Sequence, residues 1–486
     1  MIVQCDAWLV GRPTSRVLTA PRPRHHLSAT SKDDEIDILK GEWNSTKFGA
    51  TKSWRKRPLL LKGAFATESL PTWEEVLELA CCAGDDEEAI MAESLTCRLI
   101  QHKPDTLDTY TVDFGPFANP EEVQGFLVNQ RTETASTLVV NDVDRWIPDL
   151  SDWMDRHFAF LPRWRRDDAQ VSLAATGGGI GPHVDNYDVF LIQTAGSREW
   201  EVASTTISTQ DEMENLVEAS QVRILNLTAL ELNTTVVELE PGDCLYLPPR
   251  YAHWGTSLSD DCVTLSVGCR TPSASDILSK LTESVAMSTL EAAVRRYTDS
   301  NLLTTTTSGS LSTGVRGKMQ NLVTNLVQDL VNDDKFFDDM IGRLITEPNR
   351  PVYDYPTPLY EMDEAWKESL GVWGDAEATF DAVLDGYGVL RRAEGLSFAW
   401  SFLPDSLKGN LYVKGEAYPI EATKKSRKAV EALLDRVSNG PPIDGAWLNE
   451  TIIIEDEMDE SMEEFLLEML EEGLIYGDET FEEADA

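Results

Sequence analysis

Residues 177–202 read GGGIGPHVDNYDVFLIQTAGSREWEV, and this stretch decides the fold of the chain. Its apolar runs are short and alternate with turns that contain glycine, proline and aspartate. The same pattern extends from about residue 168 to residue 270, in the runs VSLAAT, DVFLIQT, REWEVA, TVVELE, CLYLP and CVTLSVG. Several short strands at such spacing are typical of a β-sandwich or a β-barrel. We therefore predict a sandwich or barrel in this part of the chain.

Within this stretch, one residue separates His183 from Asp185. In a β-strand, residues i and i+2 point to the same face, so an imidazole and a carboxylate can enter one barrel interior. A third ligand is expected from the distant segment PGDCLYLPPRYAHWG, residues 241–255, which contains His253. Two histidines and one carboxylate form the facial set of Fe(II) oxygenases, which leaves three coordination positions open. These residues therefore predict a catalytic iron site.

The chain contains only six histidines, and two of them lie in its first 31 residues. Of the other four, His183 and His253 occur in the two matching contexts just described. A lone histidine in a strand or helix is more often a satisfied core residue than a ligand. We therefore interpret His102 and His157 as structural residues.

Arg198 follows the metal segment, and its alternation with Trp200 and Val202 directs it inward. An inward arginine in an apolar barrel needs an anion for its planar guanidinium, and a dicarboxylate cosubstrate would provide one. A buried pair with an acidic residue of the protein is the alternative. Three hydroxyl groups on the predicted strands could add hydrogen bonds to the cosubstrate; they belong to Ser172, Thr264 and Ser266.

The chain has 486 residues, which is too long for one core, because single cores stop growing at roughly 250–300 residues. Beyond residue 272, amphipathic stretches at 274–297 and 315–346 predict helices joined by a loop rich in Thr, Ser and Gly. Small helices and a hairpin turning at Lys414-Gly415-Glu416 indicate a winged-helix module near the end. We predict a leader at 1–31, a catalytic domain at 32–272, a helical region at 273–384 and a winged-helix-like domain with an acidic tail at 385–486.

The formal net charge is −42, which would repel nucleic-acid phosphates and attract a basic protein. The alternative is that acidity only keeps the protein soluble. The last 32 residues hold 15 acids and no Lys or Arg, so we expect no direct DNA binding. No apolar run approaches the roughly 20 residues that span a bilayer, so we expect no membrane association. Seven cysteines without a CxxC pair are interpreted as reduced thiols, mostly buried.

Residues 1–31 contain four arginines and a single acid. An arginine- and serine-containing, acid-poor leader is typical of an organelle transit peptide. We therefore expect a plastid or a mitochondrion, with an unstructured tail of a cytoplasmic protein as the alternative.

In five segments the chain resembles the JmjC-type ribosomal oxygenases, which depend on 2-oxoglutarate, and especially their bacterial arginine-hydroxylating branch. The matching segments are SWRKRPLLLKGAF (53–65), ESLTCRLI (93–100), FGPF (114–117), FLPRWRRDDAQVSLAATGGGIGPHVDNYDVFLIQTAGSREWEV (160–202) and PGDCLYLPPRYAHWGTS (241–257). The resemblance implies an α+β chain with a double-stranded β-helix (a cupin or JmjC jelly roll), a helical dimerisation region and a C-terminal winged helix. It also places the iron ligands on His183, Asp185 and His253, and the arginine that binds 2-oxoglutarate on Arg198.

The resemblance implies Fe(II), 2-oxoglutarate and O2 as cofactor and cosubstrates, a homodimer, and a basic ribosomal protein as substrate. In the nearest branch the target is the β-carbon of an arginine in the sixteenth protein of the bacterial-type large subunit. Histidine hydroxylation or lysine demethylation at the same iron centre is the enzymatic alternative. A non-catalytic metal-binding cupin that mediates assembly, or a metal-dependent isomerase, would be an alternative of another class.

Overall fold

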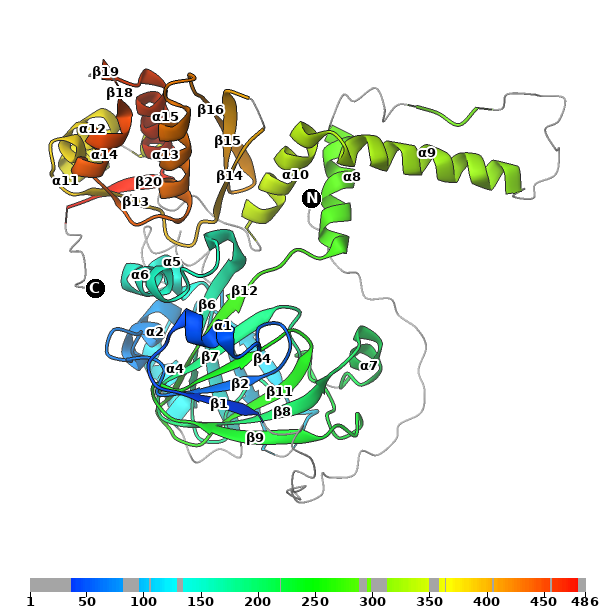
Figure 1. Ribbon diagram of the computed structural model, residues 1–486. Coiled ribbons are helices and arrows are strands. Elements are labelled where there is room, and N and C mark those ends of the chain that lie inside the picture. Colours follow the sequence, from blue (N-terminus) through cyan, green and yellow to red (C-terminus); the bar gives the residue numbers. More distant parts are fainter. Residues whose placement is uncertain are drawn as a thin grey trace.

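The computed structural model describes residues 36–479, apart from 82–95, 105, 129–133, 219, 288–294, 299–312, 349–357, 363, 404–405 and 455–456. Its first part is a barrel built from a nine-stranded sheet, in the order β1-β2-β10-β7-β12-β6-β5-β3-β4, and a facing three-stranded sheet, in the order β11-β8-β9 (Figure 1). The strands of the large sheet are β1 (Asp37–Lys40), β2 (Leu59–Lys62), β3 (Cys97–His102), β4 (Thr111–Phe114), β5 (Ala135–Val140), β6 (Arg166–Ala174), β7 (Asp188–Ala195), β10 (Cys244–Leu247) and β12 (Cys262–Cys269). Those of the small sheet are β8 (Arg198–Thr206), β9 (Thr234–Leu239) and β11 (Tyr251–Ser257). The barrel that the short apolar runs predict is confirmed.

Helices cover the outer face of the large sheet and fix its position. They are α1 (Ser45–Ala50), α2 (Trp73–Ala80), α4 (Pro120–Val128), α5 (Val143–Trp146) and α6 (Pro148–His157), while α7 (Thr209–Glu214) lies apart near the small sheet. Phe190 of β7 is fully buried in this core, with ring centroids 5.1 Å from Phe158 and 5.0 Å from Tyr246. Burying such a side chain contributes about 1.5–3 kcal/mol. This packing anchors β7 a few residues after Asp185.

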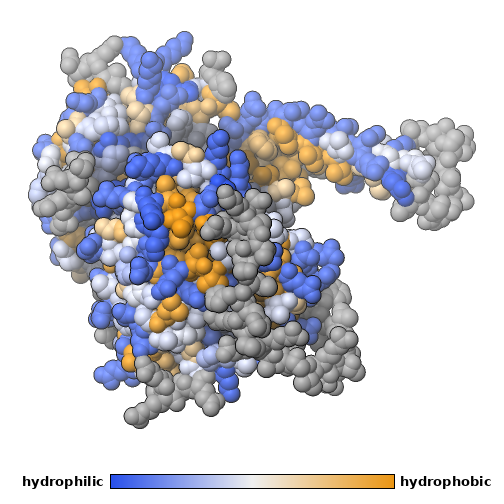
Figure 2. Space-filling view, turned by 60° about the horizontal axis from the view of Figure 1, so that its bottom comes forward, coloured by the Kyte–Doolittle hydropathy of each residue, from blue (hydrophilic) through white to orange (hydrophobic). Residues whose placement is uncertain are grey.

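Three helices follow the barrel: α8 (Ala274–Met287), α9 (Thr313–Val331) and α10 (Asp334–Thr346). The single helix predicted over 315–346 is wrong, because Asp333 caps a new helix there by accepting a hydrogen bond from the backbone of Phe336 at 3.1 Å. α9 projects from the body of the molecule (Figure 1), and Figure 2 shows apolar atoms along this arm. The predicted leader and most of the Thr/Ser-rich loop lie outside the described residues. None of the described helices combines the length and apolar character needed to cross a bilayer.

The last part of the chain has its own hydrophobic core and three described sheets: β17-β13-β20, β14-β15-β16 and the two-stranded β18-β19. Its elements are α11 (Glu364–Leu370), α12 (Ala376–Leu384), β13 (Val389–Arg392), β14 (Phe398–Phe402), β15 (Lys408–Val413), β16 (Glu416–Glu421), α13 (Arg427–Asn439), β17 (Ile443–Asp444), α14 (Gly445–Ile452), β18 (Ile453–Ile454), β19 (Glu457–Met458), α15 (Glu460–Glu471) and β20 (Ile475–Asp478). The predicted hairpin turn is confirmed: Lys414 and Gly415 both have positive φ between β15 and β16. α12 lies before residue 385, yet Phe380 and Val383 on it pack into this core.

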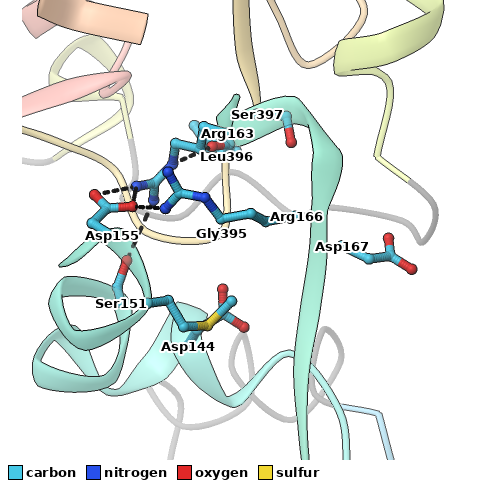
Figure 3. A pocket seen from close by; sticks show the side chains of 10 residues that line it. Asp144, Ser151, Asp155, Arg163, Arg166, Asp167, Gly395, Leu396 and Ser397 are labelled. Atoms are coloured by element: carbon cyan, nitrogen blue, oxygen red, sulfur yellow. Dashed lines mark hydrogen bonds and ion pairs between the residues drawn. The ribbon is translucent and has the colours of Figure 1, made fainter. Parts of the chain in front are cut away.

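An ion-pair cluster joins the barrel to this C-terminal part (Figure 3). Asp155 of α6 lies 2.6 Å from Arg163 Nη1 and also pairs with Arg166. It lies 2.8 Å from Arg392 Nη2 as well. Burial alone would raise the pKa of the Asp155 carboxyl, but the three guanidinium groups hold it well below its usual range. Since Arg392 comes from β13, this carboxylate couples the two parts of the molecule.

Candidate metal centre

A two-residue backbone bridge brings the two predicted histidine ligands together. The His183 amide donates to the His253 carbonyl at 3.0 Å, and the His253 amide donates to the His183 carbonyl at 2.9 Å. His253 lies in β11, whereas the segment of His183 and Asp185 is a loop before β7 with only this isolated bridge. The expectation that these two residues sit in a regular strand is therefore wrong. The mutual pairing of opposite residues nevertheless places both imidazoles on one side.

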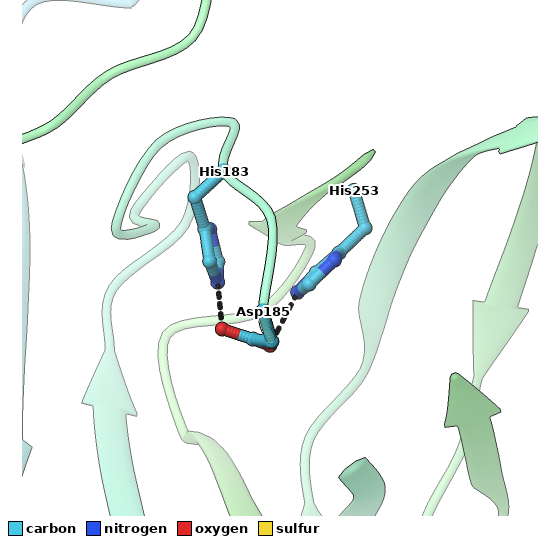
Figure 4. A group of neighbouring side chains, drawn as sticks. All are labelled: His183, Asp185 and His253. Carbon is cyan, nitrogen blue, oxygen red and sulfur yellow. Dashed lines mark ion pairs between the residues drawn. The ribbon is translucent and has the colours of Figure 1, made fainter. Parts of the chain in front are cut away.

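The three predicted ligands converge on one point (Figure 4). Asp185 Oδ1 lies 4.0 Å from His183 Nε2, and Asp185 Oδ2 lies 3.6 Å from His253 Nε2. One ligand atom from each of the three residues lies within 4.8 Å of the others. Because metal–ligand bonds to nitrogen and oxygen are about 2.0–2.2 Å long, one ion can bridge such a set after small adjustments. The site can therefore hold a divalent metal with three protein ligands.

Hydrogen bonds to the backbone set the tautomer of both imidazoles. Nδ1 of His183 donates to the Gly181 carbonyl at 2.9 Å, and Nδ1 of His253 donates to the Tyr251 carbonyl at 3.0 Å. A carbonyl oxygen can only accept, so Nδ1 of each ring carries a proton, and Nε2 is the nitrogen that can bind a metal. This arrangement orients metal-binding histidines in many proteins.

Burial keeps one of the imidazoles neutral and leaves the other two ligands accessible. Burial and the neighbouring His183 lower the pKa of His253 to about 4, although the Asp185 charge opposes this shift. The side chain of His253 is 2% exposed, against 23% for His183 and 34% for Asp185. The cluster therefore opens on the side of His183 and Asp185, where a substrate could enter.

The glycine run before the ligands permits the close backbone approach that was predicted. Gly181 has φ +87°, and a Cβ added to it would lie 2.2 Å from Ile224 Cδ1. A Cβ on Gly179 would lie 2.2 Å from the carbonyl oxygen of Gly255 in β11. Side chains at these positions would push the His183 loop away from His253.

Arg198 points into the barrel, as its alternation predicts, and is 3% exposed. Its Nη1 donates to Ser172 Oγ at 3.2 Å, while Nε and Nη2 have no hydrogen-bond partner. Among the described residues no carboxylate forms an ion pair with it, so the alternative of a buried pair with a protein acid is not observed there. Unsatisfied guanidinium donors in a buried site fit the carboxylate of a small anion.

The structure separates the predicted hydroxyl groups. Ser172 contacts Arg198, but Thr264 Oγ1 donates to Gln193 Oε1 at 2.9 Å and is not directly on the arginine. Ser266 lies further along β12, next to Gln170 of β6. Gln193 itself was missed, although its position in the alternating run DVFLIQT could have placed it inside the barrel.

The predicted structural roles of the two other histidines are confirmed. His102 is 4% exposed and stacks on Tyr110, with ring centroids 4.2 Å apart. His157 stacks on Trp153 at 4.4 Å and donates from Nδ1 to the Trp153 carbonyl at 2.8 Å. Neither belongs to the metal cluster.

Comparisons with known proteins agree with this geometry. Residues 154–277 match the family model of the JmjC domain. The chain is 31% identical over 229 residues to a probable ribosomal oxygenase of Haemophilus influenzae. This match covers 46% of this chain and 49% of that protein. It is 29% identical over 317 residues to the ribosomal protein uL16 3-hydroxylase of Escherichia coli. This second match covers 65% of this chain and 75% of that protein. The resemblance to the JmjC-type ribosomal oxygenases is confirmed.

Solved structures of the Escherichia coli ribosomal oxygenase YcfD have a similar fold. One superimposes with a TM-score of 0.64 at 23% identity, covering 90% of this chain and 98% of the other. A second, of YcfD in complex with cobalt and succinic acid, gives a TM-score of 0.62 at 23% identity, covering 89% and 97%. These matches confirm a JmjC or cupin-type fold of mixed α and β content.

Proposed function

We propose, on the premise that this chain carries a JmjC domain and is related to the ribosomal oxygenases, that it is a 2-oxoglutarate-dependent dioxygenase that hydroxylates a ribosomal protein. One observation carries the proposal: an open two-histidine, one-carboxylate cluster shares a barrel with a buried arginine of which two donor nitrogens lack partners. A metal cluster alone would also fit a non-catalytic cupin. The unsatisfied arginine favours a chelating cosubstrate with a second carboxylate.

In this proposal one set of residues binds the metal and another set binds the cosubstrate. His183, Asp185 and His253 hold Fe(II), and Asp185 contributes the only negative charge among the three ligands. Arg198 and Ser172 bind the far carboxylate of 2-oxoglutarate, while Thr264 holds Gln193 in place beside them. Bound Fe(II) supplies the activation of O2 that is coupled to oxidation of 2-oxoglutarate.

The protein around the metal positions the reactants and limits water. Trp200 is 3% exposed, and its ring centroid lies 5.7 Å from that of His253. Its side chain forms part of the barrel wall on the side of the small sheet. The neutral His253 imidazole loses no proton when it binds metal. The exposed side of Asp185 leaves room for a substrate side chain next to the metal.

We propose an arginine of a bacterial-type large-subunit ribosomal protein as the target, hydroxylated at its β-carbon. The relative from Escherichia coli is named for uL16, and a chain of net charge −42 attracts a basic segment of such a protein. Histidine hydroxylation or lysine demethylation at the same centre is the alternative. These activities differ in the side chain that is modified, so an assay with different target peptides distinguishes them.

The assay uses purified protein with Fe(II), 2-oxoglutarate and basic peptides from uL16, read by mass spectrometry for the gain of one oxygen atom. Turnover on the arginine peptide supports the proposal, and turnover on histidine peptides alone moves the assignment to the alternative. Asp185→Ala should lower turnover more than about 100-fold, because even partners of metal ligands contribute 10- to 100-fold. Glu238→Ala, an exposed carboxylate on β9 of the same barrel, should retain full turnover.

We further propose that the helices after the barrel form a homodimer and that the C-terminal part is a winged-helix-like domain. Large apolar side chains on α8 and α9 are exposed: Leu278 is 56%, Met319 48% and Val323 62% exposed. A second copy that packs on this arm would bury them. Val323→Glu should convert a dimer to a monomer in light scattering, whereas the exposed Gln320→Glu should not.

We also propose that residues 1–31 direct the protein to a plastid or mitochondrion, since these organelles contain bacterial-type ribosomes. A fluorescent protein fused behind these residues should accumulate in one of the two organelles. Diffuse cytoplasmic fluorescence would contradict this localisation.

A further inference from the structure

Arg250, in the turn between β10 and β11, has an unusual backbone conformation. Its φ is +72°, the largest positive value of any non-glycine residue in the part of the chain that the structure describes. A β-carbon is unfavourable in this left-handed region, where glycine is the usual residue. Contacts made by the Arg250 side chain therefore offset a conformational cost that a glycine at this position would not have.

The backbone of Arg250 holds the loop that carries two of the three candidate metal ligands. Its amide donates a hydrogen bond to the Asp185 carbonyl at 2.8 Å. Together with the paired hydrogen bonds between His183 and His253, this bond ties the ligand loop to the start of β11 at two points. A shift of Arg250 would therefore move the Asp185 backbone and, with it, the carboxylate.

The guanidinium of Arg250 joins three segments around this loop. Its Nε donates to the Ile207 carbonyl at 3.1 Å, directly after β8. Its Nη1 donates to Asn186 Oδ1 at 3.0 Å, one residue after the ligand Asp185, and to Glu212 Oε2 of α7 at 2.7 Å. Its Nη2 is buried without a hydrogen-bond partner and adds nothing to this network. The side chain thus connects the ligand loop with α7 and with the segment that leads into it.

Glu212 supplies the counter-charge and is 7% exposed, although α7 is a short surface helix. Its carboxylate lies 2.7 Å from Arg223 Nη2 and 2.7 Å from Arg250 Nη1. The Arg223 side chain is 65% exposed and that of Arg250 only 20%, so water screens the pair with Arg250 less. Further along the same insertion, the Leu225 amide donates to the Pro182 carbonyl at 2.8 Å. The insertion between β8 and β9 therefore contacts the ligand loop both before and after its two ligands.

We propose that Arg250 is a positioning residue for the metal centre, which fixes Asp185 through its backbone and makes metal affinity depend on the docking of α7 through its ion pair with Glu212. The inference rests on the proposed function in one respect, because it takes a divalent metal as the ligand of the cluster. It assigns a role to two residues that do not touch the metal. Since glycine adopts the Arg250 conformation without cost, side chain and backbone can be tested separately.

The test measures Mn(II) affinity by calorimetry and the visible spectrum of bound Co(II), both with the full-length protein. Arg250→Gly and Arg250→Ala lose the side chain but keep the amide that bonds to Asp185. We expect both to bind Mn(II) about tenfold more weakly, the lower end of the range for partners of metal ligands. Arg250→Gly should nevertheless unfold at a higher temperature than Arg250→Ala, because only glycine is unstrained at this φ. A merely structural role predicts instead that affinity follows stability, so that Arg250→Gly binds Mn(II) normally.

Glu212→Gln tests the ion pair from its other end, because it keeps the size of the side chain and removes its charge. The Mn(II) affinity should fall by a factor similar to that in Arg250→Gly, and the Co(II) spectrum should shift in the same direction. The variant with both substitutions should bind no more weakly than Arg250→Gly alone, since both remove the same pair. Glu214→Gln, exposed on the same helix, is the matched control and should change neither affinity nor spectrum. Thermal unfolding verifies that each variant is folded.

Each other outcome overturns the inference, the proposed function or both. Unchanged Mn(II) affinity in either Arg250→Gly or Glu212→Gln overturns the positioning role, whether or not a ribosomal peptide is hydroxylated. Weaker affinity in both variants, with no hydroxylation of any ribosomal peptide by the unmodified protein, leaves the positioning role standing and removes the proposed function. An unmodified protein that binds neither metal removes both.

Discussion

Two buried charged clusters in this molecule differ in how they are satisfied. At the junction of the barrel and the C-terminal part, Asp155 pairs with three arginines, and each of these contributes a direct contact. Inside the barrel, Arg198 has one weak contact to a hydroxyl and two donors without partners. We call the first cluster closed because a protein carboxylate balances its charge, although Arg166 and Arg392 each keep an Nε without a partner. We call the second cluster open because no carboxylate among the described residues pairs with Arg198. An open buried charge indicates a ligand, and a closed one indicates a structural joint.

The two clusters should therefore respond in opposite ways to neutralisation. Removing the central charge of the closed cluster leaves like charges buried together and weakens the fold. Removing the Arg198 charge of the open cluster eliminates a buried guanidinium without a counter-charge. It should weaken ligand binding without weakening the fold. Each of the following experiments tests a part of this contrast.

Asp155→Asn should have the largest effect, a loss of about 3–5 kcal/mol in the free energy of unfolding, because three buried guanidinium groups lose their counter-charge. Denaturant titration followed by tryptophan fluorescence measures it. Asp149→Asn, on the exposed side of the same helix, should change stability by less than about 1 kcal/mol. Equal stability of Asp155→Asn and the unmodified protein would show that the joint is not closed by this carboxylate.

Arg198→Gln should weaken 2-oxoglutarate binding about 100-fold, because glutamine lacks both the charge and the paired hydrogen bonds of a guanidinium. Calorimetry with Mn(II) in place of iron measures this affinity without turnover. The free energy of unfolding should stay the same or rise, in contrast to Asp155→Asn. Glu199→Gln, whose side chain points out of the same strand, serves as the control. A variant that unfolds as readily as Asp155→Asn would place Arg198 among the structural groups.

Gly181→Ala tests whether the open site depends on its backbone. The added Cβ meets Ile224 at a position with φ +87°, so the loop must shift, and the carbonyl that holds His183 Nδ1 shifts with it. We expect about tenfold weaker binding of Co(II) or Mn(II), the lower end of the range for partners of metal ligands. Gly317→Ala, where α9 offers open space, should bind metal normally and be slightly more stable. Unchanged metal affinity in Gly181→Ala would show that this hydrogen bond does not orient His183.

The metal site and the open cluster around Arg198 were predictable from the sequence because their residues carry local signals. His183 and Asp185 are separated by one residue, and Arg198 alternates with buried Trp200, so strand geometry and chemistry gave the same answer. The strand predicted at His183 was wrong, because this residue lies in a loop and is held by a bridge to His253, 70 positions away. Such a bridge leaves no periodic pattern in the sequence.

The closed cluster could not be predicted for a related reason. Arg392 reaches Asp155 across 237 positions, and single arginines and aspartates in helices and strands are usually solvated. The break between α9 and α10 was missed because apolar residues recur at helical spacing on both sides of it, although the polar run at 332–335 and the helix cap Asp333 mark it. Ligand sites with fixed chemistry leave a motif, whereas joints between parts of a chain depend on the complete fold.

His102 represents an intermediate case: its Nδ1 contacts the Lys103 carbonyl at 3.3 Å, while its buried Nε2 has no hydrogen-bond partner. Burial lowers its pKa below the usual value, and its stack on Tyr110 leaves no counter-charge for a proton. The unfolded chain, with a histidine pKa of about 6.5, therefore binds the proton more tightly, so stability should fall as the pH drops from about 6.5 toward the folded pKa. The stability that the neutral His102 contributes is fully present above the unfolded pKa. By pH 5.5 the loss of stability amounts to at most about 1.4 kcal/mol.

The measurement compares the unmodified protein with His102→Phe, which keeps an aromatic ring against Tyr110 and cannot titrate. The difference in unfolding free energy between the two proteins should be constant above pH 7 and should move in favour of His102→Phe by pH 5.5. Taking the difference removes the contribution of the large acidic net charge, which both proteins share. A difference that stays constant down to pH 5.5 would mean that His102 accepts its proton inside the fold. Its surroundings would then resemble the open cluster around Arg198, with room for a charge that the protein does not pair.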